Sequence, residues 1–161
     1  MPTLKEEIGK RNPFSSLEEE AYLSLLRTIT TLETPFARLL KSRGLSEPTY
    51  NILRLLRGHA QAEDANPHGI PCQTIGDQLV SRLPDVTRLV DRLEKAGLVK
   101  RARTPDDRRV VLVSITKKGL AILGELDKPV ADLHRQVLRH MARPELMELN
   151  RLLAKARTPE A

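Results

Sequence analysis

The sequence predicts a mainly helical fold with a small β element (α+β), in which two short helices and a β-hairpin stand between longer terminal helices. Three observations lead to this prediction. Apolar residues recur at helical spacing near both ends of the chain. Two short helical patterns follow each other closely in the middle, and directly after them two alternating apolar segments flank the turn signal "TPDD". At 161 residues, the chain is expected to form one domain.

The N-terminal region is predicted to contain a flexible arm and two helices. Residues 1–14 are polar, carry two prolines and show no periodicity, which is typical of an arm. From Ser15, "SSLEEE" offers a capping box for a long helix with one apolar face. Gly44 can then end this helix and Ser46 can cap the next one, which is expected to end near His59.

The middle of the chain is predicted to form a helix-turn-helix with a hairpin attached. A loop rich in proline and glycine contains a short strand at 70–72. Helices are expected at 74–81 and 84–96, the second opened by a proline in its first turn. Strands at 99–103 and 109–115 follow directly.

The terminal helices are predicted to join two copies of the chain. In the C-terminal third, leucines and valines repeat in steps of three and four, and Pro144 precedes a last short helix. Segments 15–44 and 117–157 therefore flank a winged segment, 46–116, that has a core of its own. Because their apolar faces would otherwise meet water, we expect a homodimer, with 15–157 as its single folded domain.

Composition narrows the class of partner. The chain carries a net charge of +6 and a pI near 9.8, which favours a polyanionic partner without proving one. With two Phe, two Tyr and no Trp, a surface that stacks unpaired bases is poorly supported, so duplex DNA is favoured. The single cysteine excludes an intrachain disulfide. No signal-like segment or membrane-length apolar run is present, so a cytoplasmic protein without a membrane partner is expected.

The second helix of the motif carries the candidate base readers. Arg88 and Arg92 lie four residues apart and share an exposed face with Asp85. The major groove accepts one helix and the arginine fork fits guanine, so Arg88 and Thr87 are predicted to read bases. Asp85 is expected to cap the helix or to accept from a cytosine amino group. The alternative is a solvated face of ion pairs without a DNA contact.

The hairpin tip is predicted to enter a narrow groove. Its proline fixes the turn, so Arg103, Arg108 and Arg109 project from the end of a short ribbon. Asp107 can pair with a neighbouring arginine and hold it outward. The valines and isoleucine of 111–115 are expected to alternate onto the core side and anchor the ribbon.

Two motifs, "DVTRLVDRLEKAGLVKR" and "DRRVVLVSITKKG", resemble the MarR family of winged helix-turn-helix transcriptional regulators in their order and spacing. The resemblance extends more weakly over about residues 15–157. It implies a homodimer with interlocked terminal helices, a motif helix in the major groove and a wing in the minor groove. It also implies groove-facing roles for Thr87 and Arg88, and a wing Asp-x-Arg motif at Asp107 and Arg109.

A small-molecule effector site is predicted where the terminal helices meet the winged segment. Such a junction offers apolar walls and can alter the spacing of two recognition helices. Phe36, Leu40 and Tyr50 are the expected lining residues, and the effector is expected to be a small aromatic or phenolic molecule.

No residue pattern points to catalysis, a cofactor or a metal. There is no nucleophile set, phosphate-cradling glycine loop or carboxylate pair in a suitable context, so the chain is not expected to be an enzyme. Surface positions are favoured over a zinc site for the histidines, which are His59, His68, His134 and His140. For Cys72, an inert half-buried thiol is favoured over a redox switch.

The function that these patterns favour is sequence-specific binding of double-stranded DNA. The hypothesis is a homodimeric, ligand-responsive transcriptional regulator, acting as a repressor on a pseudo-palindromic operator. The alternative is a winged-helix protein-interaction module that uses the basic hairpin on an acidic partner, because a fold alone does not fix a function. The arginines on the helix face and at the hairpin tip favour DNA.

Overall fold

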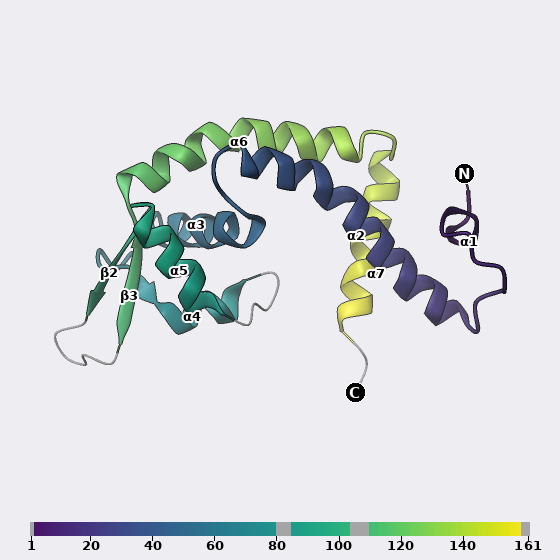
Figure 1. Ribbon diagram of the computed structural model, residues 1–161, viewed down its shortest axis with the longest axis horizontal. Coiled ribbons are helices and arrows are strands. Elements are labelled where there is room, and N and C mark those ends of the chain that lie inside the picture. Colours follow the sequence, from purple (N-terminus) through teal and green to yellow (C-terminus); the bar gives the residue numbers. More distant parts are fainter. Residues whose placement is uncertain (1, 80–84, 104–109, 159–161) are drawn as a thin grey trace. The chain divides into compact units, whose positions relative to one another are not determined.

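The computed structural model describes residues 2–79, 85–103 and 110–158 (Figure 1). Its helices are α1 (Leu4–Glu7), α2 (Leu17–Lys41), α3 (Glu47–Ala60), α4 (Cys72–Gln78), α5 (Val86–Lys95), α6 (Lys117–Val137) and α7 (Arg143–Arg157). Its strands are β1 (Ile70–Pro71), β2 (Val99–Arg103) and β3 (Val111–Ile115). They form one antiparallel sheet in the order β1-β3-β2. The predicted fold class, mainly helical with a small β wing, is confirmed.

The chain divides into two compact units, Met1–Gly124 and Glu125–Ala161. The first contains α1 to α5 and the sheet, and therefore both halves of the predicted helix-turn-helix. The second contains α7, whose first turn holds Pro144, the residue predicted to separate the last helix from the one before it.

The N-terminal segment contains an element that periodicity did not reveal. Residues 1–14 were expected to lack regular structure, yet α1 forms there with Thr3 as its cap. The Thr3 hydroxyl accepts from the backbone N–H of Glu6, and the Glu6 carboxylate accepts from the Thr3 N–H at 2.7 Å. A four-residue helix is too short to show an apolar repeat, so only this capping box could have indicated it. Ser16 caps α2, close to the predicted start.

The core of the first unit lies between α3 and the winged elements. Ser46 caps α3 and the helix ends at Ala60, close to the predicted bounds. Buried apolar side chains from α3, α4, α5 and β3 form this core, and they include Ile52, Leu53, Leu56, Ile75, Val90, Leu93 and Val113. Gly44 and Gly97 follow α2 and α5 with φ of 71° and 72°, in the left-handed region that favours glycine after a helix.

The two motif helices differ at their ends from the prediction. Helix α4 begins at Cys72 rather than Thr74 and its helical hydrogen bonding ends at Gln78. Helix α5 begins at Val86 because Asp85 is its cap and accepts from the Arg88 N–H at 3.1 Å. The predicted bounds at Ser81 and Pro84 lie outside the described residues.

The sheet register places the hairpin strands side by side, with Val99 opposite Ile115 and Arg103 opposite Val111. Val113 and Ile115 are buried as predicted, but Val111 is only half-buried and Leu112 is buried. The prediction of strict alternation was therefore wrong at these two positions. Strand β3 is central in the sheet and contacts both α3 and α4, so its burial does not follow a single face.

Candidate nucleic-acid interface

Helix α5 presents three different faces along its length. Val90 and Leu93 are buried in the core. Thr87, Asp91 and Glu94 are spaced by four and three residues, which places them on one side of a helix. That side faces β2, because Arg101 of β2 contacts all three residues. A third set of side chains, Arg88 and Arg92 with Lys95, is exposed to solvent.

Asp85 and Arg88 form a local pair at the start of α5. One Asp85 oxygen caps the helix through the Arg88 N–H, and the other lies 2.8 Å from the Arg88 Nε. The Arg88 side chain is nevertheless 86% exposed, so its outer guanidinium nitrogens are open to a ligand. An ion pair of the kind expected for a solvated face is therefore present at the start of α5, and the guanidinium of this pair is exposed.

Arg101 connects the hairpin to α5. Its Nη1 donates to Glu94 Oε2 at 3.2 Å and also contacts Asp91 Oδ1, while its Nη2 donates to the Thr87 carbonyl oxygen at 3.1 Å. Its backbone N–H donates to Glu94 Oε1 at 3.2 Å. The side chain is only 23% exposed. We call these contacts the Arg101 network.

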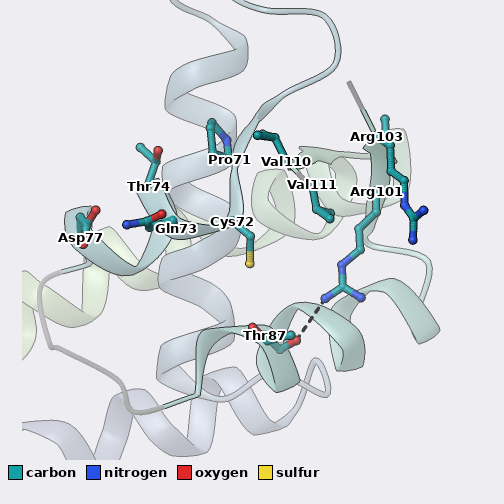
Figure 2. Close-up of a pocket in the computed structure, with 11 residues that line it drawn as sticks. Pro71, Cys72, Gln73, Thr74, Asp77, Thr87, Arg101, Arg103, Val110 and Val111 are labelled. Atoms are coloured by element: carbon teal, nitrogen blue, oxygen red, sulfur yellow. Dashed lines mark hydrogen bonds between the residues drawn. The ribbon is translucent and has the colours of Figure 1, made fainter. Parts of the chain in front are cut away.

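A cavity of about 860 Å³ lies between α4, the first turn of α5 and the two hairpin strands (Figure 2). Figure 2 shows Arg101 reaching from β2 toward Thr87, with Arg103 extending on the same side of the strand. The lining comprises Pro71, Cys72, Gln73, Thr74, Asp77, Thr87, Arg101, Ala102, Arg103, Val110 and Val111. The predicted base reader Thr87 and the predicted wing residue Arg103 thus border one concave surface.

The structure locates most of the predicted DNA-binding residues. Thr87, Arg88, Arg92 and Arg103 are exposed, and Asp85 is half-buried as the cap of α5. The remaining predicted wing residues, Asp107, Arg108 and Arg109, lie outside the described residues.

The predicted effector residues lie on α2 and α3 rather than around the cavity of Figure 2. Leu40 is 1% exposed and Tyr50 6% exposed, so both belong to the core, while Phe36 is half-buried. Cys72 is a half-buried free thiol that lines the cavity of Figure 2.

Sequence reasoning missed Arg101. The sequence did contain a feature that points to this residue. Asp91 and Glu94 are two acids on the same side as Thr87, on a helix that is expected to approach a polyanion. Acidic side chains on a helix that approaches DNA favour a neutralising cation beside them, and the alternation of β2 puts Arg101 and Arg103 on one face. The pairing of Arg101 with Asp91 and Glu94 depends on the turn after α5, because this turn sets which residues of β2 lie beside which residues of the helix.

Two absences concern only the described part of the chain. Within residues 2–79, 85–103 and 110–158, no group of three or more His, Cys, Asp and Glu side chains is arranged to hold a metal ion. Among the helices described there, none is both long and apolar enough to cross a bilayer.

A helix-turn-helix with an exposed cationic second helix, followed by an antiparallel hairpin, defines a winged-helix DNA-binding protein. The model of the MarR family matches residues 45–111, from two residues before α3 to the first residue of β3. The crystal structure of a MarR transcription factor from Planctomyces limnophilus is 42% identical, with 88% of this chain and 98% of that chain covered and a TM-score of 0.66. The chain belongs to the MarR family and is a DNA-binding transcriptional regulator.

Two further similarities extend over most of the chain. The HTH-type transcriptional regulator FarR of Neisseria gonorrhoeae is 27% identical over 143 residues, covering 89% of this chain and 92% of FarR. An organohalide-sensing transcriptional regulator, solved in its 2,4-dichlorophenol-bound form, is 22% identical with a TM-score of 0.79, covering 92% of this chain and 86% of that one. At this identity the second likeness concerns the fold alone. These similar proteins are transcription regulators, in line with the expectation of a non-enzymatic role.

Proposed function

We propose that this protein is a homodimeric, ligand-responsive repressor that binds a pseudo-palindromic operator. The observation that carries the proposal is Arg88, whose guanidinium is 86% exposed at the start of α5 while Asp85 holds its Nε. An arginine fork oriented at the start of a recognition helix matches the O6 and N7 acceptors of guanine.

Each predicted site residue has a distinct role in this proposal. Arg88 reads a base with Thr87 beside it, and Asp85 orients Arg88 through its second oxygen. Arg92, one turn further along α5, holds a phosphate. Asp107 orients the wing arginines, which enter the minor groove and are Arg103, Arg108 and Arg109.

The homodimer is supported by an apolar stripe on α2. Tyr22, Leu25, Leu26 and Ile29 follow the spacing of one helix face, and each residue is between 37% and 62% exposed. A second copy of the chain is the partner that covers this stripe. Two recognition helices then reach half-sites about one turn, or 34–36 Å, apart on the duplex.

Titration of the purified protein into random duplex at low salt, followed by selection of genomic fragments, tests the function. Nonspecific binding in the micromolar range and recovery of sequences with two-fold symmetry are expected. A protein-interaction module would show neither result. A promoter–reporter assay then tests repression, since a repressor bound at its operator lowers expression when the protein is present.

The wing is expected to add affinity and a preference for A/T-rich flanks. Arg109→Ala should weaken operator binding without changing the bases preferred by α5, because the minor groove reports mainly A·T against G·C and its width. The slope of log affinity against log salt should fall by about one unit for each phosphate or groove interaction that the substitution removes. Unchanged slopes and flank preferences would show that Arg109 does not enter the groove.

The effector site is proposed at Phe36, Leu40 and Tyr50 on α2 and α3. A likeness in fold to a regulator solved with 2,4-dichlorophenol makes phenolic ligands the first class to test. Since Leu40 and Tyr50 are almost fully buried, a ligand must open the packing between these helices before it can bind.

Such a ligand is expected to stabilise the protein and weaken its binding to DNA. At a hundred times its dissociation constant, a ligand that binds only the folded state adds about 2.7 kcal/mol of stability. By linkage, a phenol that weakens operator binding must bind the DNA-bound protein more weakly by the same factor. Thermal melts and operator titrations with a panel of aromatic acids and phenols measure both effects. A panel that changes neither quantity would remove the support for this site, and Tyr50→Ala should abolish any response.

A further inference from the structure

In the Arg101 network, a cationic side chain of the wing binds groups of the protein itself, whereas a residue that contacts DNA directly would be open to solvent. We propose that Arg101 is a positioning residue that fixes strand β2 against α5, so that the recognition helix and the wing reach their grooves at one set spacing. This inference rests on the proposed function, because its readout is operator binding.

The network spans nearly the whole of α5. It begins at the Thr87 carbonyl in the first turn and ends at Glu94 in the last, a rise of about 10 Å along the helix. One guanidinium contacts both ends, and its planar fork can serve acceptors in different directions at once. A lysine ammonium, as a compact point charge, could not satisfy the same acceptors from the same place. Arg101 therefore limits both sliding and rotation of β2 along the helix.

Arg101 adds a further attachment to strand β2, beside the pairing of this strand with β3 and its buried Val99. The sheet order β1-β3-β2 leaves it at an edge, paired only with β3 among the described strands. Arg101 lies two residues before Arg103, the last residue of the strand and the first of the proposed groove contacts. A contact at this point fixes the direction in which the ribbon leaves the domain.

The charges of the network distinguish positioning from direct DNA contact. Asp91 and Glu94 place two carboxylates on the groove-approaching helix, where they repel phosphates. Arg101 is occupied by these carboxylates and only 23% exposed, in contrast to Arg88. On electrostatic grounds alone, removing the acids should tighten DNA binding. If Arg101 acts through the position of β2, removing them should weaken it.

The test is therefore the double variant Asp91→Ala/Glu94→Ala, in which alanine preserves helix propensity. We expect operator affinity to fall about tenfold, the coupling typical of a broken network of this kind, even though two negative charges are removed. The preference for A/T-rich flanks should weaken while the bases read by α5 stay the same. Asp77→Ala is the matched control, because Asp77 lines the same cavity from α4 and its replacement should leave affinity unchanged or raise it.

A second measurement covers the case in which the double variant fails to fold. Arg101→Lys keeps the positive charge but loses the planar guanidinium. The loss of operator affinity that it causes is measured once in the wild-type protein and once in the Arg103→Ala variant. If Arg101 acts through the wing, the combined loss of affinity is smaller than the product of the two single losses. Independent, multiplicative losses, or a double acid variant that binds as tightly as wild type, overturn the inference. A wild-type protein that binds no duplex would instead overturn the proposed function.

Discussion

Placing two aspartates on the exposed apolar stripe of α2, Leu25→Asp with Ile29→Asp, is expected to convert the dimer to a monomer and to abolish operator binding at ordinary concentrations. Both side chains are exposed in the single chain, Leu25 at 37% and Ile29 at 50%, so the core is not disturbed. In the proposed dimer both would be covered, and a buried unpaired carboxylate costs several kcal/mol. Two such charges on each copy exceed what an apolar interface of this kind can tolerate.

The loss of DNA binding follows from the loss of the second recognition helix. A dimer that binds two half-sites through its two recognition helices gains about 10² to 10⁴ in affinity over a monomer that binds one half-site. Light scattering should report a mass near 18.1 kDa for the variant and about twice that for the wild type. Operator titration at fixed salt should show the corresponding loss of affinity.

A matched control lies on the opposite side of the same helix. Thr31 and Thr34 are exposed and stand away from the stripe, so Thr31→Asp with Thr34→Asp adds the same charge without entering the proposed interface. This control should remain dimeric. A wild-type protein that is a stable monomer at micromolar concentration, or a stripe variant that stays dimeric, would rule out α2 as the dimer surface.

The elements that the sequence predicted well are those with strong local signals. Ser46 and Gly97 mark helix ends through capping and backbone conformation, which depend on a few neighbouring residues. The hairpin strands followed from alternation on either side of a turn signal. Strict alternation failed at Leu112, because the burial of a central strand depends on which helices pack against it, and this is a tertiary property.

Only the solvent-exposed residues of the candidate site could be predicted from the sequence. Arg88 and Arg92 could be assigned because helical spacing alone decides which residues share the exposed face of α5. Arg101 could not be distinguished from Arg103 by sequence, since both are arginines on one face of the same strand. What separates them is the distance from the turn after α5, which brings Arg101 beside the acids of that helix.

Replacing Arg88 by alanine is expected to cost more binding energy than any other single substitution on α5. A bidentate arginine–guanine pair contributes about 1–3 kcal/mol of discrimination, and a dimer loses it at both half-sites. Operator affinity should fall by about one to four orders of magnitude, while binding to random duplex changes little. Selection from a randomised library should show relaxed preference at one position of each half-site.

Two further substitutions determine whether Arg88 reads a base or holds a phosphate. Arg88→Lys keeps the charge but loses the fork, so it should bind random duplex like the wild type and still lose preference at that position. Arg92→Ala should weaken binding to every sequence alike and lower the salt slope, as expected for a backbone contact. If Arg88→Ala instead weakens all sequences equally, Arg88 is a phosphate contact. In that case its neighbour Thr87 must read the base. The ion pair with Asp85 would then hold the positive charge of Arg88 near a phosphate rather than orient its guanidinium toward guanine.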